Sequence, residues 1–341
     1  MEATVGINGF GRVGRAAFRA AYERGLELDW RGINDLADAE TLARLLKYDS
    51  VYGRFPGLVS AGPDFIEVDG KRIPVFQEAE PAALDWREAG AEVVIEATGR
   101  FRTRAAAAGH LAGGARKVIV SAPMKDADAT VVLGVNYDEV YDADEHHVIS
   151  NASCTTNCLA PVAAVLHDSV GFRHGLMTTI HAYTADQRLI DLPHKDPRRS
   201  RAAALNLIPT STGAAKAIGL VIPDLAGKLN GFAVRAPIPT GSIVDLTVET
   251  ERPTSVEEIN ELFRARSDVG RLEGILAYND EPLVSSDIVR STYSAIFDAP
   301  LTAVVDGTQL KVVAWYDNEW GYSNRLVELA LEVSVRERVA A

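Results

Sequence analysis

Thr4-Val5-Gly6-Ile7-Asn8-Gly9-Phe10-Gly11-Arg12-Val13-Gly14 is the stretch that decides the fold of the N-terminal part of the chain. The residues before Gly9 predict a buried strand, and residues 13–24 predict an amphipathic helix rich in Ala and Arg. The turn between them follows the pattern G-x-G-x-x-G. In that pattern the first glycine permits a tight turn, the second admits a pyrophosphate, and the third lets helix and strand pack closely. Because the helix start offers free N–H groups and a positive dipole, the stretch predicts a dinucleotide site.

Asp35 lies where such a site places its acidic residue, about 20 residues after the last glycine and at the end of the next predicted strand. Its carboxylate can accept hydrogen bonds from the adenosine ribose and would repel a 2′-phosphate. The next residue, Leu36, offers no cation for that phosphate. We therefore expect NAD rather than NADP. A glycine-rich turn in a flavin fold or another nucleotide fold is the alternative interpretation.

Strand and helix patterns alternate through the first part of the chain. This alternation predicts an α/β fold with a Rossmann-type, doubly wound parallel sheet. The strands are expected at residues 28–34, 93–97, 117–121 and 147–150, and the helices at residues 39–46 and 104–111.

After Cys154 the pattern changes to long alternating stretches, which predict a second, α+β domain with a mixed or antiparallel sheet covered on one face. These stretches are residues 175–184, 231–236, 242–251 and 309–316, and residues 323–335 predict a final amphipathic helix. We place the domain boundary near residue 152, with residues 1–152 as the dinucleotide-binding domain and residues 153–317 as the catalytic domain.

The composition excludes several classes of protein. The 341 residues carry a net charge of −12, which disfavours binding to nucleic acid or to acidic membranes. No apolar run is long enough to span a bilayer, and the N-terminus lacks the pattern of a signal peptide. The 2 Cys cannot build a disulfide framework, and the histidines lack zinc-ligand spacing. We expect a cytoplasmic protein without a metal.

Cys154 is the candidate nucleophile because a helix is predicted to begin beside it, capped by Asn151 or Ser153. The helix dipole and the free N–H groups would stabilise a thiolate and an oxyanion. Among the 7 His, His181 is the best candidate for the base, since it ends an apolar strand beside a polar loop. From its position alone, a structural histidine is the favoured interpretation of His181. Cys158, one helical turn after Cys154, is expected to be a buried thiol rather than a disulfide partner.

These motifs resemble those of the phosphorylating, NAD-dependent glyceraldehyde-3-phosphate dehydrogenases, and the similarity runs nearly end to end. The stretches that carry it are Gly6-Ile7-Asn8-Gly9-Phe10-Gly11-Arg12, Leu46-Lys47-Tyr48-Asp49-Ser50, residues 150–161 around Ser153-Cys154-Thr155-Thr156-Asn157-Cys158, and Trp315-Tyr316-Asp317-Asn318-Glu319-Trp320-Gly321-Tyr322-Ser323.

The resemblance implies roles for individual residues. Cys154 would be the nucleophile and His181 its base. The cofactor contacts would be Gly11, Arg12, Val13, Asp35, Ser121, Asn318 and Tyr322. The pocket for the substrate's own phosphate would be formed by Thr184, Asp186 and Arg235, and the pocket for the attacking phosphate by Ser153, Thr155, Arg199, Thr212 and Gly213. Charged forks and hydroxyl groups suit such anions, and we expect Asp186 to orient Arg235 or nearby hydroxyl groups.

The resemblance also bears on assembly. Residues 183–204 match the family's S-shaped loop, which implies a homotetramer, and Leu192-Pro193 within it resembles the NAD-preferring pattern. The C-terminal helix, about residues 318–341, would return to the cofactor domain. One departure is the lack of an arginine in residues 77–80, where many relatives have one near the adenine.

The implied reaction is the oxidation of D-glyceraldehyde 3-phosphate by NAD, with release of a Cys154 thioester by inorganic phosphate to give 1,3-bisphosphoglycerate, a step of glycolysis and gluconeogenesis. An erythrose-4-phosphate dehydrogenase is the nearest alternative, and the set Arg199, Thr212, Gly213 and Arg235 argues against it. A non-catalytic binding role on the same fold is the other alternative, and the retention of Cys154 with His181 favours catalysis.

Overall fold

The computed structural model describes residues 3–340, with side chains through residue 337. The chain forms two compact units. The first comprises residues 3–131, 138–152 and 323–340, and the second comprises residues 132–137 and 153–322. Residues 132–137, which we expected in the first domain, thus cluster with the second unit.

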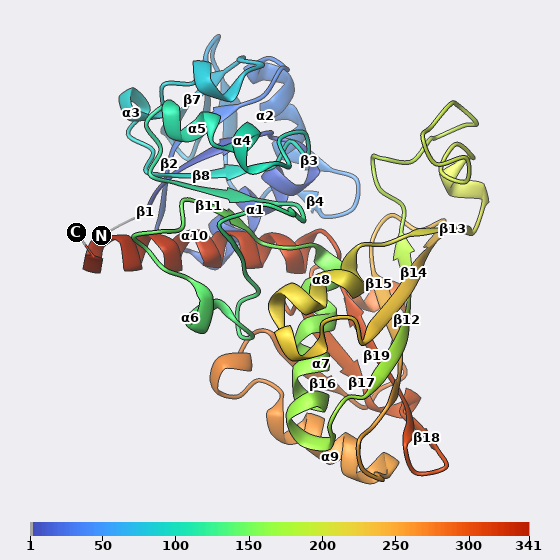
Figure 1. Cartoon of the computed structure of the whole chain (residues 1–341). Coiled ribbons are helices and arrows are strands. Elements are labelled where there is room, and N and C mark those ends of the chain that lie inside the picture. Colours follow the sequence, from blue (N-terminus) through green and yellow to red (C-terminus); the bar gives the residue numbers. More distant parts are fainter. Residues whose placement is uncertain (1–2, 341) are drawn as a thin grey trace. The chain divides into compact units, whose positions relative to one another are not determined.

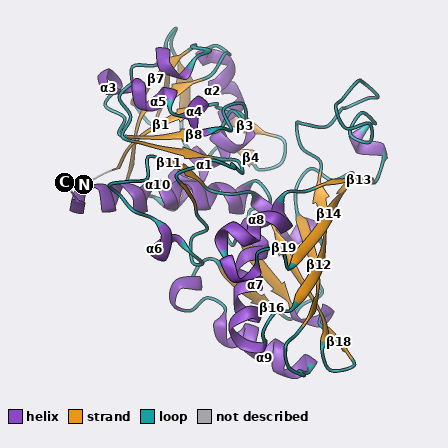
Figure 2. Ribbon diagram, viewed as in Figure 1, coloured by secondary structure: helices purple, strands orange, loops and turns teal. Residues whose placement is uncertain are grey.

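The first unit is built on a sheet whose central strands are parallel (Figures 1 and 2). Its strands are β1 (Ala3–Asn8), β2 (Leu28–Asn34), β5 (Val59–Ala61), β6 (Phe65–Val68), β7 (Lys71–Phe76), β8 (Val93–Glu96), β9 (Lys117–Val120), β10 (Ala129–Thr130) and β11 (Val148–Ser150), with a separate hairpin of β3 (Tyr48–Asp49) and β4 (Gly53–Arg54). The order is β10-β11-β9-β8-β1-β2-β7-β6-β5, and only the β7-β6-β5 edge is antiparallel.

The helices associated with this unit are α1 (Arg12–Arg24), α2 (Ala39–Lys47), α3 (Trp86–Ala89), α4 (Arg104–Ala107), α5 (Gly109–Ala112), α6 (Tyr137–Val140) and α10 (Trp320–Ala340). Two of the expected helices have other bounds in the structure. The helix expected over residues 104–111 is divided into α4 and α5, and the final helix is longer at both ends than residues 323–335.

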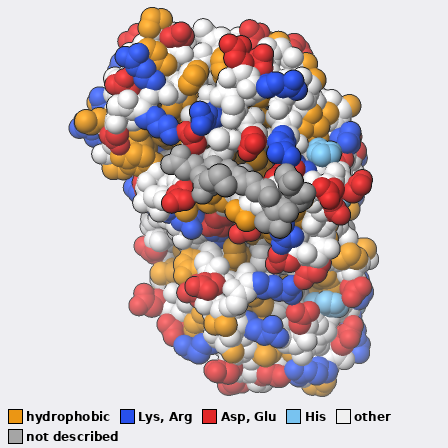
Figure 3. All heavy atoms as spheres, turned by 90° about the vertical axis from the view of Figure 1, so that its left-hand side faces the viewer, with side chains coloured by type: hydrophobic (Ala, Val, Ile, Leu, Met, Phe, Trp, Pro, Cys, Tyr) orange, Lys and Arg blue, Asp and Glu red, His pale blue; other side chains and the backbone are white. Residues whose placement is uncertain are grey.

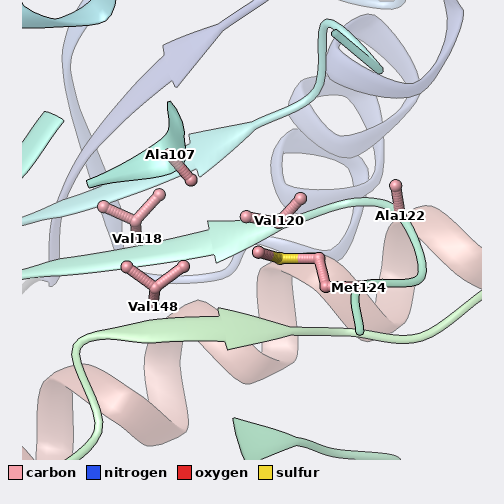
Figure 4. Close-up of a cluster of buried hydrophobic side chains, with 6 residues drawn as sticks. All are labelled: Ala107, Val118, Val120, Ala122, Met124 and Val148. Carbon is pink, nitrogen blue, oxygen red and sulfur yellow. The ribbon is translucent and has the colours of Figure 1, made fainter. Parts of the chain in front are cut away.

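Strand β1 lies between β2 and β8, so the strand order runs towards one edge of the sheet through β2 and towards the other edge through β8. Ligands of doubly wound sheets bind outside the carboxyl ends of the strands at such a point. The residues that follow β1, β2 and β8 are therefore placed to form a site. A cluster of buried side chains from α4, β9, the loop after β9 and β11 supports this edge of the sheet (Figure 4): Ala107, Val118, Val120, Ala122, Met124 and Val148.

The second unit is a mixed sheet with helices on one face (Figure 1). Its strands are β12 (His174–Ala182), β13 (Ile208–Ser211), β14 (Leu229–Ala236), β15 (Ser242–Glu249), β16 (Leu276–Asn279), β17 (Ala295–Asp298), β18 (Ala303–Val305) and β19 (Gln309–Tyr316), and its helices are α7 (Cys154–Val170), α8 (Ala214–Val221) and α9 (Val256–Arg266). The order is β13-β14-β12-β15-β19-β17-β16, with β18 paired to β19.

Burial alternates along β12 and β15, as expected for a sheet covered on one face. Helix α7 packs on β17 and β19, and α8 packs on β14. Between β12 and β13, residues 183–207 form a long, largely irregular loop that extends beyond the end of the sheet (Figure 2). The alternation thus correctly predicted the kind of sheet, while the loop has no period that a pattern could detect.

Candidate active site

The glycine-rich turn has the geometry that its sequence predicts. Gly9 has φ +92°, and a Cβ there would lie 2.6 Å from the backbone nitrogen of Thr98. At Gly14 a Cβ would lie 2.2 Å from the carbonyl oxygen of Gly9, so α1 can approach the turn only with glycine at that position. The space beside Gly11, the N-cap of α1, is open. The turn therefore leaves room for a phosphate in front of the helix N-terminus, and the residues present fit a dinucleotide.

A cavity of about 230 Å³ adjoins this turn within the first unit. Its lining comes from the ends of β1, β2 and β8 and the loop after β7: Asn8, Gly9, Gly11, Asn34, Asp35, Leu36, Glu78, Ala79, Ala97, Thr98, Arg100 and Phe101. A larger open groove of about 850 Å³ lies over α2 and β5, but neither the glycine-rich turn nor Asp35 lines it, so the smaller cavity is the candidate cofactor pocket.

Asp35 lines the cavity, and both of its carboxylate oxygens are held by backbone N–H groups. Phe10 donates to one oxygen at 2.8 Å and Ala37 to the other at 3.2 Å. The carboxylate thereby also braces the glycine turn. Arg100 was missed from the sequence, although it brings a cation to this pocket from the loop after β8. Residues 78 and 79, in the stretch where many relatives have an arginine, border the same pocket without a cation.

The other cofactor candidates of the first unit have mixed settings. Arg12 forms an ion pair with Asp49 and lies over the ring of Tyr52, so its role as a pyrophosphate contact stays a prediction. Val13 follows it in the first turn of α1. Ser121, half-buried directly after β9, donates its N–H to the carbonyl of Glu96 at 2.9 Å.

Cys154 is the first residue of α7, and of the two expected caps the structure uses Ser153. The Ser153 hydroxyl accepts the N–H of Thr156 at 3.0 Å. The preceding residue, Ala152, has φ +53°, an unfavourable left-handed conformation for a residue with a Cβ. Cys154 thus sits at the positive end of a 17-residue helix, at a turn that the surrounding structure holds in place.

His181, the penultimate residue of β12, meets Cys154 as the sequence-based hypothesis required: its Nε2 lies 3.4 Å from Sγ. Its Nδ1 lies 2.7 Å from the carbonyl oxygen of Ala182. Arg235 stands opposite His181 in the register of β12 and β14, and its Nη1 lies 2.6 Å from Nδ1 and 2.9 Å from the same carbonyl. A base requires the tautomer with Nδ1–H: the carbonyl of Ala182 can then accept from both Nδ1 and Arg235, and the lone pair of Nε2 faces the thiol.

Burial controls the protonation of this pair. It raises the pKa of the Cys154 thiol, although Arg235 and nearby hydroxyl and N–H groups act in the opposite direction. Burial and, as a smaller cause, the charge of Arg235 together lower the pKa of His181 to about 3. The sequence suggested a thiolate stabilised at the helix N-terminus. The structure instead presents a neutral thiol facing a neutral imidazole, which is ready to take the proton as the sulfur reacts.

Tyr316, at the end of β19, is a site residue to which the sequence gave no separate role. Its hydroxyl lies 2.9 Å from the hydroxyl groups of Thr155 and Thr179, and its ring meets the ring of His181 edge-on. The Thr155 hydroxyl is therefore turned into the protein, where the residue is 4% exposed. The role of Thr155 in the pocket for the attacking phosphate stays a prediction. The sequence offered one sign of the role of Tyr316: this residue ends an apolar strand and belongs to the motif that begins at Trp315.

Arg199 is held by a cluster of polar groups, and one of its contacts differs from the expected role of Asp186. Its guanidinium pairs with Asp186, which therefore orients Arg199 and not Arg235. The same guanidinium donates to the Thr210 hydroxyl at 2.8 Å and to the carbonyl of Ser211 at 3.2 Å. Asp186 is also 3.4 Å from Nε2 of His194, a histidine that sequence position did not single out.

The remaining anion-site candidates lie on backbone turns near these groups. Gly213 is the N-cap of α8, and the Thr212 hydroxyl accepts the N–H of Ala214 at 3.2 Å. Thr184, two residues after β12 ends, donates its N–H to the side chain of Gln187 at 3.3 Å. The structure thus places Thr212 and Gly213 directly after the strand that Arg199 contacts.

Asn318 is buried in the second unit, and its amide oxygen is the acceptor for two hydroxyl groups. Ser242 donates to it at 2.7 Å and Thr240 at 3.5 Å. These bonds fix the orientation of the amide, as a residue that holds a carboxamide requires. Tyr322 is buried in the first turn of α10.

Within residues 3–340, no three Cys, His, Asp or Glu side chains converge as metal ligands, and no helix has the length and hydropathy to span a membrane. On the face in Figure 3, acidic and basic side chains intermingle.

A dinucleotide-binding sheet together with a cysteine–histidine pair at a helix start is typical of nicotinamide-dependent oxidoreductases that form a covalent intermediate. Comparison with known proteins narrows this class. The model of the glyceraldehyde 3-phosphate dehydrogenase NAD binding domain matches residues 3–104, and the model of the C-terminal domain matches residues 153–318. The chain belongs to the glyceraldehyde 3-phosphate dehydrogenase family, and NAD is its cofactor.

Curated relatives agree over nearly the whole length. The chain is 56% identical to glyceraldehyde-3-phosphate dehydrogenase 1 of Streptomyces avermitilis, over 98% of this chain and 99% of the relative. It is 56% identical to the glyceraldehyde-3-phosphate dehydrogenase of Geobacillus stearothermophilus over the same shares. The enzyme of that name from Mycobacterium avium is 59% identical over 96% of this chain and 98% of the relative.

Proposed function

We propose that this protein catalyses the NAD-dependent, phosphorylating oxidation of glyceraldehyde 3-phosphate to 1,3-bisphosphoglycerate. The observation that carries the proposal is the 3.4 Å approach of His181 Nε2 to Cys154 Sγ, with Arg235 against the same imidazole. Glyceraldehyde 3-phosphate has an aldehyde for the Cys154 nucleophile and an anionic phosphate group for the nearby guanidinium of Arg235. The full-length similarity to enzymes of this name supports the same substrate.

The proposed sequence begins with attack of the Cys154 sulfur on the aldehyde carbon, while the thiol proton passes through Nε2 of His181 to the aldehyde oxygen, which gives a thiohemiacetal. The Nε2 of His181 takes the hydroxyl proton as the C–H bond breaks. NAD supplies the oxidation by accepting the hydride. The N–H groups at the start of α7 stabilise the oxygen anion in each addition step. Inorganic phosphate then attacks the thioester carbon and the C–S bond breaks. The departing thiolate of Cys154 takes the proton held on Nε2 of His181, which restores the neutral thiol and the neutral imidazole.

Two anion positions follow from the charged groups of the site. We assign the phosphate of the aldehyde to Arg235 with Thr184, and the attacking phosphate to Arg199 with Ser153, Thr212 and Gly213. Arg199 is already fixed by Thr210 and Ser211, so it can bind an anion without a large loss of side-chain freedom.

We further propose a homotetramer in the cytoplasm. Large apolar side chains of the loop after β12 and of the chain entering β13 are exposed in the isolated chain, Leu189 and Leu205 by more than 80%. Exposed apolar side chains of this kind favour burial against another subunit. Light scattering at micromolar protein concentration would test the assembly, and a monomer would contradict it.

The reaction is tested by steady-state assays with glyceraldehyde 3-phosphate and with erythrose 4-phosphate, each with and without inorganic phosphate. We expect turnover of the triose to depend on phosphate. Phosphate-independent turnover of the tetrose would instead favour an erythrose-4-phosphate dehydrogenase.

Cys154→Ser should abolish turnover while NAD binding persists. Cys158→Ser is the matched control, because Cys158 is a fully buried thiol four residues along the same helix. Comparable turnover of Cys154→Ser and the parent enzyme would contradict the assignment of the nucleophile.

A further inference from the structure

A buried polar network lies beneath the cofactor pocket of the first unit, outside every role assigned above. Its members are at most 3% exposed: Asn8, Asn34, Trp86, Glu96 and His110. Buried polar groups are costly unless every donor and acceptor is satisfied, and a buried carboxyl group is especially so. The hydrogen bonds of the Glu96 carboxyl group therefore indicate its role.

The carboxylate of Glu96, at the end of β8, accepts from donors on both of its oxygens. Its Oε1 accepts the N–H of Thr98 at 2.8 Å and the Thr98 hydroxyl. Its Oε2 accepts the amide Nδ2 of Asn8 and lies 3.1 Å from Nε2 of His110. Oε1 therefore holds the turn that follows β8, and Oε2 is bound to groups on two other segments of the chain.

Trp86 determines the tautomer of His110. The indole Nε1–H, which can only donate, lies 3.0 Å from Nδ1 of His110. Nδ1 must accept this bond, so the ring proton is on Nε2 and points to Glu96. A second proton on Nδ1 would face the indole N–H, and the ring is accordingly neutral. Gly6 makes this arrangement possible, because a Cβ there would lie 2.5 Å from the Trp86 ring.

From Asn8 the network continues to the far wall of the pocket. The Oδ1 of Asn8 accepts the side-chain amide of Asn34 at 2.7 Å. Asn34 then clamps the backbone of Glu78, donating to its carbonyl at 2.9 Å and accepting its N–H at 2.9 Å. One chain of hydrogen bonds thus connects the ends of β1, β2 and β8 with the loop after β7, the four segments that line the cavity.

We propose that Glu96 and His110 are positioning residues for the adenosine half of NAD: the carboxylate holds the four pocket-lining segments in register, and His110, locked by Trp86, is its neutral donor. The inference rests on the proposed use of NAD in this cavity, which we assign to the adenosine half because Asp35 lines it. It predicts an effect on cofactor affinity rather than on the chemistry at Cys154.

Glu96→Gln tests the proposal, because an amide nitrogen would face donors on one side where the carboxylate presents an acceptor. We expect the Kd for NAD, measured by titration calorimetry on the full chain, to rise at least tenfold. In steady state the KM for NAD should rise in parallel, while kcat falls less than threefold. The double variant Asn8→Asp with Glu96→Gln reverses the polarity of the central hydrogen bond, and it should return the Kd to within threefold of the parent value.

His110 provides a second, milder test if Glu96→Gln does not fold. Glutamine can donate to Glu96 and accept from Trp86 as the fixed tautomer does, so His110→Gln should bind NAD within twofold of the parent. His110→Leu should weaken binding at least fivefold. Equal Kd values for these two variants would overturn the proposal.

The matched control is Lys117→Met, which removes a fully buried charged side chain of the neighbouring strand β9, away from the cavity. It should lower Tm and leave the Kd for NAD within twofold. A Glu96→Gln variant that behaves like this control would show that the network serves stability alone. Asp35→Gly distinguishes a failure of the positioning role from a failure of the pocket assignment. If this variant weakens NAD binding and Glu96→Gln does not, only the positioning role fails; if the Asp35 variant has no effect on NAD affinity, the pocket assignment itself fails.

Discussion

Replacing Arg235 by Leu removes the cation closest to the imidazole of His181, and the consequence can be calculated from the geometry. The guanidinium Nη1 lies 2.6 Å from Nδ1. Two unit charges centred about 4 Å apart repel by about 4 kcal/mol at an effective dielectric constant of about 20, which corresponds to about 3 pKa units. Burial is the larger cause of the low pKa of His181 and persists in the variant. We therefore expect the pKa of His181 to rise by about 1–3 units.

The sign of the effect on Cys154 follows from the same charge. Arg235 lowers the pKa of the thiol, in opposition to burial. The variant should thus have less thiolate at neutral pH, and each rise of 1 unit in the pKa of the thiol corresponds to about tenfold slower alkylation. In the parent enzyme the His181 imidazole, with a pKa of about 3, stays neutral above about pH 4. Its alkylation rate should accordingly rise in one step that is set by the thiol.

The assay is the rate of alkylation by iodoacetamide between pH 4 and pH 10, without substrate. The reagent is neutral, so the loss of an anion-binding arginine does not affect its approach. Arg199→Leu is the control, because Arg199 has the smallest of the named effects on the pKa of His181. A histidine-linked step between pH 5 and pH 8 in the parent enzyme would refute the reasoning. An unchanged rate at pH 7 in Arg235→Leu would refute it as well.

His181→Asn should lower kcat by about 10²–10⁴-fold, the usual contribution of a general base, with NAD affinity retained and the pKa of the Cys154 thiol raised; a fall of less than tenfold, or an unchanged pH profile of alkylation, would argue against this base. Asp35→Gly should raise kcat/KM with NADP relative to NAD, since it removes the charge that opposes a 2′-phosphate; an unmoved ratio would assign the preference to another residue. Asp186→Asn should lower the KM for inorganic phosphate, because it removes a negative charge beside Arg199 while Arg199 keeps its bonds to Thr210 and Ser211. The effect should be only about two- to fivefold, because Asp186 is 52% exposed. A raised KM in that assay would show that Asp186 is needed to orient the guanidinium.

Much of the fold could be predicted because its determinants are local. The G-x-G-x-x-G turn follows from steric demands at Gly9 and Gly14 that involve neighbouring residues. The alternation along β12 and β15 indicated a sheet with one covered face, and the structure has one. The break between α4 and α5 was not predictable in this way, since an Ala-rich segment favours helix at every position.

The site shows the same division. Ser153 caps α7 three residues from its hydrogen-bond partner, so a sequence pattern could place Cys154 at a helix start. The pairing of Arg199 with Asp186 depends on how the loop after β12 folds back onto β13, and the sequence pointed to Arg235 instead.

The sequence by itself determined that a dinucleotide turn, an acidic residue after the second strand and a cysteine at a helix start exist, because each depends on contacts within a few residues. The tertiary structure decided that His181 reaches Cys154, since those residues lie 27 positions apart on different elements. It also decided the protonation of that pair. Burial and the position of Arg235 across two strands oppose charge on the imidazole, and neither can be read from residue types or spacing.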